Sequence, residues 1–347
     1  MALYVFDSQR ATNVETAPLM KLDPFLLLMI TAVVIATFFP ATGHAAEIVD
    51  RLGLIGVSFL FFAHGAALSR QAVLSGLKQW QLHLFIFATT FVVFPIAVQP
   101  ISFLPTSLVP EDLQLGFLYL AVLPSAVSSS IAYTAIAKGS VPAAVCNSAG
   151  SNVFGLLLTP LLMTFFLKSS AVGAADLTHT IKDVVLQLLV PFGLGQAIHP
   201  LLGRFIARRK DWLEKYDQSV IVVIIYGAFS QSVTAGLWKI MPARSLVLTV
   251  ILCTVLLLLI FTFTIICSRR LGFTRGDEIA AVFCGSKKSL ASGLPLAQVL
   301  FAGNPGFGMI VLPIMLYNQI QILVGAILAR KYARGEVYEK PTAENLQ

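Results

Sequence analysis

The sequence has few charged residues for its length. They make up 12% of its 347 residues, and 57% of the residues are hydrophobic, whereas charged residues are about 25% of a typical soluble domain. This deficit excludes an ordinary soluble fold. The net charge of +7 is not concentrated in one segment, because the basic residues fall in short clusters between apolar runs. That distribution indicates orientation in a membrane rather than nucleic-acid binding.

The sequence also lacks the motifs of an enzyme or a metal centre. Its four cysteines lie in or at the ends of apolar runs without metal-ligand spacing, so we expect them to be small packing residues and expect no cofactor. It has no HExxH motif, no carboxylate pair and no Ser/His pair at one depth, so we expect no catalysis. No charged ring or filter segment indicates a channel. His64 is the one histidine well inside an apolar run, where we expect it to be packed or bonded to water.

Long apolar runs are present instead. About 20 such residues cross a hydrocarbon core of roughly 30 Å. The first run follows about 23 mixed residues, unlike the short basic start of a secretory leader, so we expect it to be retained. The sequence therefore predicts an all-α integral membrane protein with ten spans: Pro24–Ala41, Leu52–Leu68, Trp80–Val98, Leu115–Ala137, Pro142–Leu167, Val184–Leu202, Gln218–Trp238, Ser245–Cys267, Ile279–Phe301 and Met309–Ala329.

Lysine and arginine positions predict the orientation. If the N-terminus is cytoplasmic, 17 basic residues lie in cytoplasmic segments and 5 in the opposite ones. Cytoplasmic loops are the ones enriched in lysine and arginine. We therefore expect both termini in the cytoplasm, with a cytoplasmic segment 1–23 and a cytoplasmic tail 330–347. The cell membrane is the expected location.

The spans divide into two halves, 24–167 and 184–329, each with five spans. Because five is odd, the second half enters the membrane in the opposite sense, which is the inverted repeat common in secondary transporters. The fourth span of each half carries an interrupted polar segment. In span four, Ser128, Ser129 and Ser130 follow Pro124; in span nine, Ser286, Lys287, Lys288 and Ser289 follow Gly285. Such matched interruptions indicate a transport site, although membrane serines also bond ordinary helix carbonyls.

The lysine pair lies at the depth of the bilayer centre. Lys287 is ten residues beyond Asp277, which corresponds to roughly 15 Å of helix. A lysine at that depth costs on the order of 2.5–3.5 kcal/mol and usually faces a pathway. We expect one lysine to line the site and the other to bond into the packing. With no acidic residue inside a span, the ammonium has three options: it can lose its proton, meet helix-end carbonyls, or pair with an anionic solute.

Several short segments resemble the bile acid:sodium symporter superfamily, over residues 20–332. In these short segments, the sequence is most similar to the sodium/bile acid cotransporter 7-like branch. The segments that carry the resemblance are 82–86, 94–95, 124–129, 147–149, 159–160, 195–196, 224–226, 283–290, 293–295 and 321–325.

This resemblance implies a panel domain from spans one, two, six and seven, and a core domain from the other six spans. In the core, helices four and nine are broken and cross, with substrate between the domains and sodium within the core. Of the sodium-site positions, Ser129 and Ser148 match, with Asn147 beside the latter. Ser130 and Thr90 stand where amide ligands are expected, Phe283 where a glutamate is expected, and Lys287 where a glutamine is expected. We hypothesise that Lys287 replaces a sodium ion, so that transport is sodium-independent and is either proton-linked or a facilitated exchange.

The predicted function is secondary transport of a small organic anion across the bilayer by alternating access, in a symporter-like protein. Bile acid itself is not expected, because substrate pockets diverge faster than folds. The alternative is a membrane regulator of ion homeostasis, calcium in particular, that has lost transport.

Overall fold

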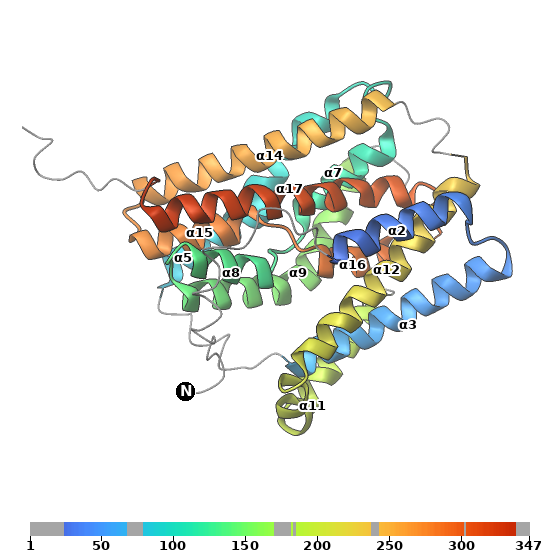
Figure 1. The fold of residues 1–347 in the computed structure, drawn as a ribbon, viewed down its shortest axis with the longest axis horizontal. Coiled ribbons are helices and arrows are strands. Elements are labelled where there is room, and N and C mark those ends of the chain that lie inside the picture. Colours follow the sequence, from blue (N-terminus) through green and yellow to red (C-terminus); the bar gives the residue numbers. More distant parts are fainter. Residues whose placement is uncertain are drawn as a thin grey trace, which may run out of the picture.

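The computed structural model describes residues 24–67, 79–169, 182, 185–236, 243–301 and 303–337. The predicted N-terminal segment 1–23 and the tail beyond residue 337 lie outside the described residues. Within the described ranges the chain forms helices joined by short loops, with no strand. The predicted all-α fold is confirmed to that extent (Figure 1).

One group of helices packs around α3. It contains α2 (Pro24–Phe38), α3 (His44–Ala67), α11 (Val190–Ala207), which the π-helix η5 (Val185–Leu189) precedes, and α12 (Lys210–Thr234). Helix α3 packs along α11 and α12, and α12 also packs against α2. These four helices lie together on one side of the molecule (Figure 1). They correspond to predicted spans one, two, six and seven.

The remaining helices form a second group. The third predicted span runs through α5 (Trp80–Ala88), the π-helix η3 (Thr89–Val93), α6 (Phe94–Val98) and the 3₁₀ helix η4 (Gln99–Phe103). Then follow α7 (Glu111–Val122), α8 (Ser128–Ile136), α9 (Val141–Ser169), α14 (Ala243–Arg270), α15 (Arg275–Ser286), α16 (Leu290–Leu300) and α17 (Phe307–Arg334). The packing of α17 on α7, α14 and α8 encloses the buried part of this group.

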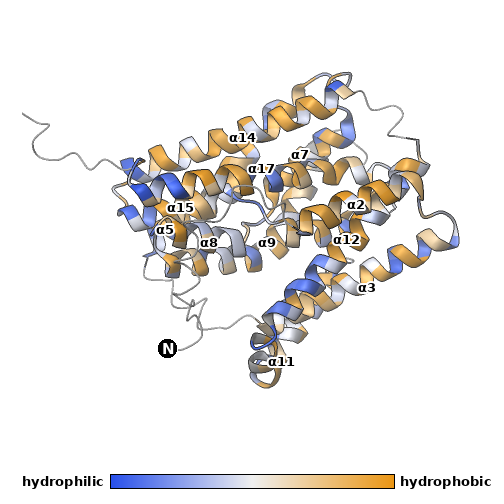
Figure 2. Ribbon diagram, viewed as in Figure 1, coloured by the Kyte–Doolittle hydropathy of each residue, from blue (hydrophilic) through white to orange (hydrophobic). Residues whose placement is uncertain are grey.

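Five described segments are long and apolar enough to cross a membrane: Trp80–Phe103, Val141–Phe166, Val185–Gly203, Ala243–Arg270 and Phe307–Arg334. Large apolar side chains lie exposed along α14, including Ile251 and Leu258, and this helix is hydrophobic over most of its length (Figure 2). Exposed apolar surface of this extent belongs against lipid. The protein is therefore an integral membrane protein; the full count of ten spans stays a prediction.

Two helices begin eight residues before the apolar spans that were predicted for them. Helix α3 begins at His44 rather than Leu52, and α12 begins at Lys210 rather than Gln218. The added turns carry charged residues such as Glu47 and Asp211. A hydropathy run stops where the apolar residues stop, whereas a helix continues into the polar membrane surface wherever its backbone hydrogen bonds continue.

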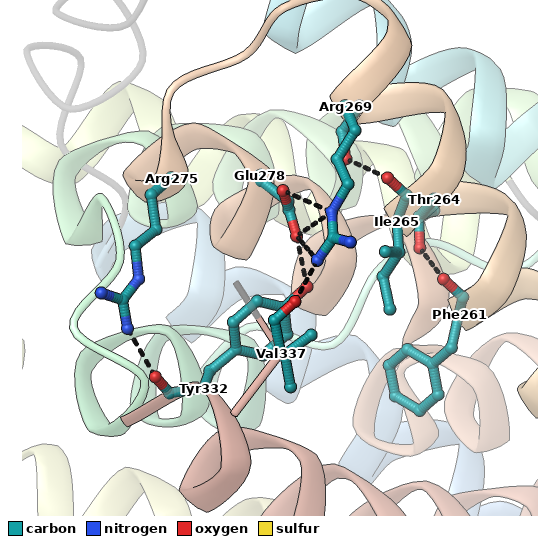
Figure 3. Close-up of polar contacts among 9 residues, drawn as sticks. Phe261, Thr264, Ile265, Arg269, Arg275, Glu278, Tyr332 and Val337 are labelled. Carbon is teal, nitrogen blue, oxygen red and sulfur yellow. Dashed lines mark hydrogen bonds and ion pairs between the residues drawn. The ribbon is translucent and has the colours of Figure 1, made fainter. Parts of the chain in front are cut away.

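A buried ion pair joins the ends of α14, α15 and α17 (Figure 3). Glu278 is fully buried, and its carboxylate accepts hydrogen bonds from Arg269 Nε at 3.1–3.2 Å and from Tyr332 Oη at 2.7 Å. Arg275 donates to the Tyr332 carbonyl at 2.6 Å. The Arg269 side chain is 42% exposed, so water screens part of its attraction to Glu278. This network holds the three helices in register at the end of the molecule opposite the start of α7.

Candidate functional site

The fourth predicted span is broken between α7 and α8. Helix α7 ends at Val122, and Leu123 is extended, with φ −69° and ψ 151°. Pro124 explains this conformation, because a proline disfavours the helical region for the residue before it. The chain then re-enters a helix at Ser128. The break leaves the last carbonyls of α7 without partners inside their own helix.

The ninth predicted span is broken between α15 and α16. Lys287 ends α15 in an extended conformation, with φ −97° and ψ 141°. Ser289 then caps α16, and its Oγ accepts a hydrogen bond from the Ser292 amide at 3.1 Å. Serine is among the preferred residues at this capping position. The two lysines therefore lie in non-helical backbone at the centre of the span.

The two breaks contact each other directly. The Ser289 amide donates to the Pro124 carbonyl at 2.9 Å. In the other direction, Ser125 Oγ donates to the Cys284 carbonyl at 2.6 Å, and Ser130 Oγ donates to the Phe283 carbonyl at 2.9 Å. Several free groups of each broken helix are thus satisfied by the other one. This meets the requirement that non-helical backbone at membrane depth be buried in protein.

The ammonium group of Lys288 lies in a cage of carbonyl oxygens. Its side chain is fully buried, and Nζ donates three hydrogen bonds of 2.7–2.8 Å, to the carbonyls of Thr90, Ala121 and Leu123. The Phe94 ring centroid lies 4.1 Å from Nζ. Three neutral acceptors and an aromatic face surround one positive charge, which is the environment that a bound cation would have.

The π-helix η3 explains why the Thr90 carbonyl is available. In this segment the Phe94 amide bonds back to Thr89, five residues earlier. The corresponding donor for Thr90 would be residue 95, which is a proline without an N–H. The carbonyl is consequently free to accept from Lys288. A π-turn of this kind often marks a functional position in a helix.

Helix α17 holds the second break by its backbone. The Gln321 side chain accepts from the Lys288 amide at 2.9 Å and donates to the Lys288 carbonyl at 2.8 Å. One turn earlier, Tyr317 Oη donates to the Ser286 carbonyl at 2.7 Å. All four residues in these hydrogen bonds are buried. The non-helical backbone at Lys288 is therefore held by hydrogen bonds from α17.

Lys287 has a different environment from its neighbour. Its side chain is also fully buried, but within the described part of the chain its Nζ has no hydrogen-bond partner. Nζ lies 3.6 Å from the centroid of the Tyr133 ring in α8. Gly325 leaves room for the pair, since a Cβ there would lie 3.3 Å from Lys287 Cε and 2.9 Å from the Tyr133 ring. The lysine thus contacts an aromatic face and no counter-ion.

Comparison with known proteins decides the family. A family model described as "SBF-like CPA transporter family" matches residues 23–334. The chain belongs to this transporter family. It is 45% identical to "Uncharacterized protein PA2026" of Pseudomonas aeruginosa and 42% identical to "Putative symporter YfeH" of Escherichia coli, covering 90% of this chain and 93% of each relative. It is 30% identical to "Sodium/bile acid cotransporter 7-B" of Xenopus laevis, over 88% of this chain and 90% of that protein. The resemblance found in the sequence is confirmed.

Within this family member, the structure places the predicted serines in unequal environments. Ser130 is buried and bonded across the breaks, whereas Ser129 is half-buried and Ser128 is exposed. Ser286 Oγ donates to Val282 within its own helix at 2.5 Å. Ser289 is the cap of α16. Of the five, Ser130 and Ser289 therefore join the two breaks.

The remaining predicted residues are near the breaks in different ways. Thr90 contributes its carbonyl, because its hydroxyl donates to Ile86 in its own helix at 2.9 Å. In α9, the Asn147 side chain donates to Ala143 at 2.9 Å. Ser148 is fully buried, with its Oγ 3.7 Å from the Cys284 sulfur. Within the described part of the chain, none of these three side chains hydrogen-bonds to a lysine ammonium, and Thr90 does so only through its backbone carbonyl.

Sequence reasoning missed a polar chain that links α9 to both breaks. The Ser125 amide donates to Ser151 Oγ at 2.9 Å, and Asn152 Nδ2 donates to the Ser125 carbonyl at 2.9 Å. On its other side, Asn152 Oδ1 accepts from Ser292 Oγ at 2.6 Å. The spacing of Ser148, Ser151 and Asn152 along one helical face was a signal for this chain. Gln321 lies in segment 321–325, one of those that carry the family resemblance, but the sequence did not indicate its bonds to Lys288.

The expectation for His64 was wrong. Its Nε2 lies 3.0 Å from Asp217 Oδ2, so the histidine joins α3 to α12 through a carboxylate rather than through packing or water alone. The sequence placed Asp217 just outside an apolar run. Because α12 begins at Lys210, that carboxylate lies two turns inside the helix, where it reaches His64.

Proposed function

We propose that this protein is a secondary transporter of a small organic anion, and that its site is the meeting point of the breaks at 123–127 and 287–289. Membership of a transporter family supports the class of function. The contacts between the breaks support the location, because interrupted helices at matching places are where such transporters bind solute and ion. The α2, α3, α11 and α12 group would move against the remaining helices by alternating access.

The observation that carries the proposal is the carbonyl cage around Lys288. In related architectures, unwound carbonyls and half-helix C-terminal ends coordinate a mobile cation. Here the corresponding acceptors, on Thr90, Ala121 and Leu123, are bonded to an ammonium of the protein itself. We infer that Lys288 takes the place of a coupling sodium ion and that transport is sodium-independent. The sequence hypothesis gave this role to Lys287, whose ammonium has no carbonyl partner.

An anionic substrate follows from the charge at the site. Neither lysine has an acidic partner among the described side chains, so the second break carries uncompensated positive charge whenever both are protonated. In a low dielectric such a charge attracts an anion strongly. We propose that Lys287 supplies this attraction, while Lys288 holds the breaks together. The relatives named as bile acid cotransporters suggest a carboxylate or sulfonate, and bile acid itself is not part of the proposal.

The same proposal includes the predicted topology. Ten spans in two inverted halves, 24–167 and 184–329, place the two breaks in the fourth span of each half. The positive residues then place both termini in the cytoplasm, and the cell membrane remains the expected location. An oligomeric state is not part of the proposal.

A paired measurement tests this function. Purified protein is screened by thermal shift against monocarboxylates, dicarboxylates, sulfonates and a bile acid, and the strongest ligand is then used in uptake by proteoliposomes. We expect uptake to be equal within about twofold in sodium chloride and choline chloride at constant pH. We expect Lys287→Gln to lower uptake at least tenfold, with Lys331→Gln, an exposed lysine of α17, as the matched control. Uptake that rises tenfold with sodium would refute the sodium-independent mechanism.

A further inference from the structure

A separate apolar groove lies between α3, α11 and α12. Its volume is about 230 Å³, and its walls include Phe59 and Phe62 of α3, Leu202 and Phe205 of α11, and Trp212 of α12. The only charged residue among those that line it is Arg209, at the turn between α11 and α12. The groove is distant in the fold from both helix breaks, since it is built only from the helix group around α3 (Figure 1).

The groove faces outward. Leu202, Phe205 and Trp212 are 36%, 56% and 53% exposed. In an integral membrane protein, exposed apolar side chains beside a helix end meet lipid rather than water. The groove suits a hydrocarbon chain, because apolar side chains form its walls. Among the described residues that line the groove, Arg209 alone has a side chain that could hydrogen-bond to a polar solute.

Aromatic rings form the wall nearest to the polar end. Trp212 stacks on Tyr216 with ring centroids 5.6 Å apart and planes at 16°. Phe59 packs edge-on against both, at 6.4 Å and 5.1 Å. Tyr216 Oη donates to the Gly56 carbonyl at 3.0 Å, so the wall is anchored to α3. Tryptophan and tyrosine in this arrangement are typical of the depth of lipid headgroups.

The charge at the mouth of the groove is positive. Arg209 lies with its guanidinium carbon 4.9 Å from the Phe205 ring centroid. Arg208 and Lys215 are exposed on the same turn and first turns of α12. Asp211 and Glu214 are exposed there too, but they do not line the groove. Among the described residues that line the groove, the Arg209 guanidinium is therefore the one charged group, and it lies over the Phe205 ring.

We propose that this groove binds an anionic phospholipid, with an acyl chain against Phe59, Phe205 and Trp212 and the phosphate bound by Arg209. Arginine presents two parallel N–H donors to a phosphate, and aromatic and aliphatic walls accept the chain. Basic pockets between membrane helices on the cytoplasmic side suit such headgroups. The site would couple the lipid to the position of α11 and α12. It does not depend on the transported solute or on the coupling ion.

Fluorescence quenching by brominated lipid tests the site directly. The chain has three tryptophans, so the double variant Trp80→Phe, Trp238→Phe reports from Trp212 alone. This protein is placed in vesicles of phosphatidylcholine that contain a fixed fraction of either brominated phosphatidylglycerol or brominated phosphatidylcholine. We expect the relative binding constant for the anionic lipid to be about fivefold higher, the factor expected for one basic residue at a charged headgroup.

Arg209→Gln in the same background should reduce the preference to near unity, whereas Arg208→Gln, with the same loss of charge one residue earlier, should leave it within about 1.5-fold of the parent value. Equal quenching by the two lipids in the parent would overturn the proposal. So would an equal loss in both arginine variants, because that result would assign the preference to surface charge. Both outcomes are read without any transport assay, so they are independent of the proposed function.

Discussion

In both helix breaks the backbone leaves the helical conformation, but the two breaks contribute different groups to the contact between them. The first break, after Val122, exposes acceptors: the carbonyls of Ala121, Leu123 and Pro124 all bond to groups of the second break. The second break, after Ser286, supplies the donors, Lys288 Nζ and the Ser289 amide. A proline makes the first break, whereas side chains of α17 hold the second. The first break thus supplies the carbonyls that bind the ammonium, and the second break carries the charge, although Ser125 of the first break also donates to the Cys284 carbonyl.

Removing the Lys288 ammonium from the second break should have the largest effect, so it is the strongest test of the difference between the two breaks. Lys288→Ala leaves three buried carbonyls without a donor, at about 1–3 kcal/mol for each group, so we expect a fall in melting temperature on the order of 10 °C. Sodium at high concentration should restore part of this loss in the variant, because the ion can enter the vacated cage. Thermal shift in sodium chloride against choline chloride measures both effects.

The parent protein is the control for this rescue. Its melting temperature should be the same in the two salts, because the ammonium already fills the cage. A parent that is stabilised by sodium as much as the variant would show that the ion binds elsewhere and that Lys288 is not its substitute.

The next largest effect is expected from Gln321, which holds the backbone of the second break. Gln321→Leu leaves the buried amide and carbonyl of Lys288 unsatisfied, at about 1–3 kcal/mol for each group. Gln321→Glu keeps an acceptor for the amide and loses the donor to the carbonyl, so it should be intermediate in melting temperature. Gln319→Leu, a half-buried neighbour on α17, is the control. Equal losses at positions 319 and 321 would contradict a specific clamp.

A steric change separates the two lysines. Gly325→Ala places a Cβ 2.9 Å from the Tyr133 ring and 3.3 Å from Lys287 Cε, so we expect about 1–3 kcal/mol of overpacking. Because the Lys288 ammonium keeps its bonds to the carbonyls of Thr90, Ala121 and Leu123 in this variant, sodium should not affect it, unlike Lys288→Ala. Uptake should fall with Lys287 displaced. Full uptake at an unchanged melting temperature would argue that Lys287 takes no part in the site.

The smallest effect isolates the aromatic contact of Lys287. Tyr133→Phe loses only the hydrogen bond from Oη to the Ile322 carbonyl, at about 1 kcal/mol. Tyr133→Leu also loses the ring beneath the ammonium, worth about 2 kcal/mol more when desolvated. The difference between the two melting temperatures measures the ring alone. Identical values would mean that the ring gives Lys287 no stabilisation.

The main features of the candidate site were readable in the sequence because they are local. Pro124 predicts a break by its effect on the preceding residue, and two lysines in an apolar run predict an interior position by their cost in lipid. The surroundings of each lysine side chain could not be predicted from the sequence in this way. Lys287 and Lys288 are adjacent and chemically identical, and only neighbours far away in the sequence give one a carbonyl cage and the other an aromatic ring. We therefore propose Lys288, rather than Lys287, as the fixed cation.

Other parts of the site depend on helix register. The carbonyl of Thr90 is free because a π-turn pairs Phe94 with Thr89 and leaves Pro95 as the missing donor. A hydropathy pattern contains no information on whether a helix makes i→i+4 or i→i+5 bonds. Similarly, the position of Gln321 opposite Lys288 requires α17 to cross the break at one height, which depends on packing over its whole length.

By itself, the sequence determined the membrane environment, the family, the two interrupted segments and the lysine pair, because composition, apolar run length and proline act over a few residues. Only the tertiary structure decided which atoms meet at the breaks. The cage around Lys288, the clamp by Gln321 and the pairing of His64 with Asp217 join residues 33 to 198 positions apart. Their free energies depend on distance in space, and distance in space is fixed only when all the helices pack together.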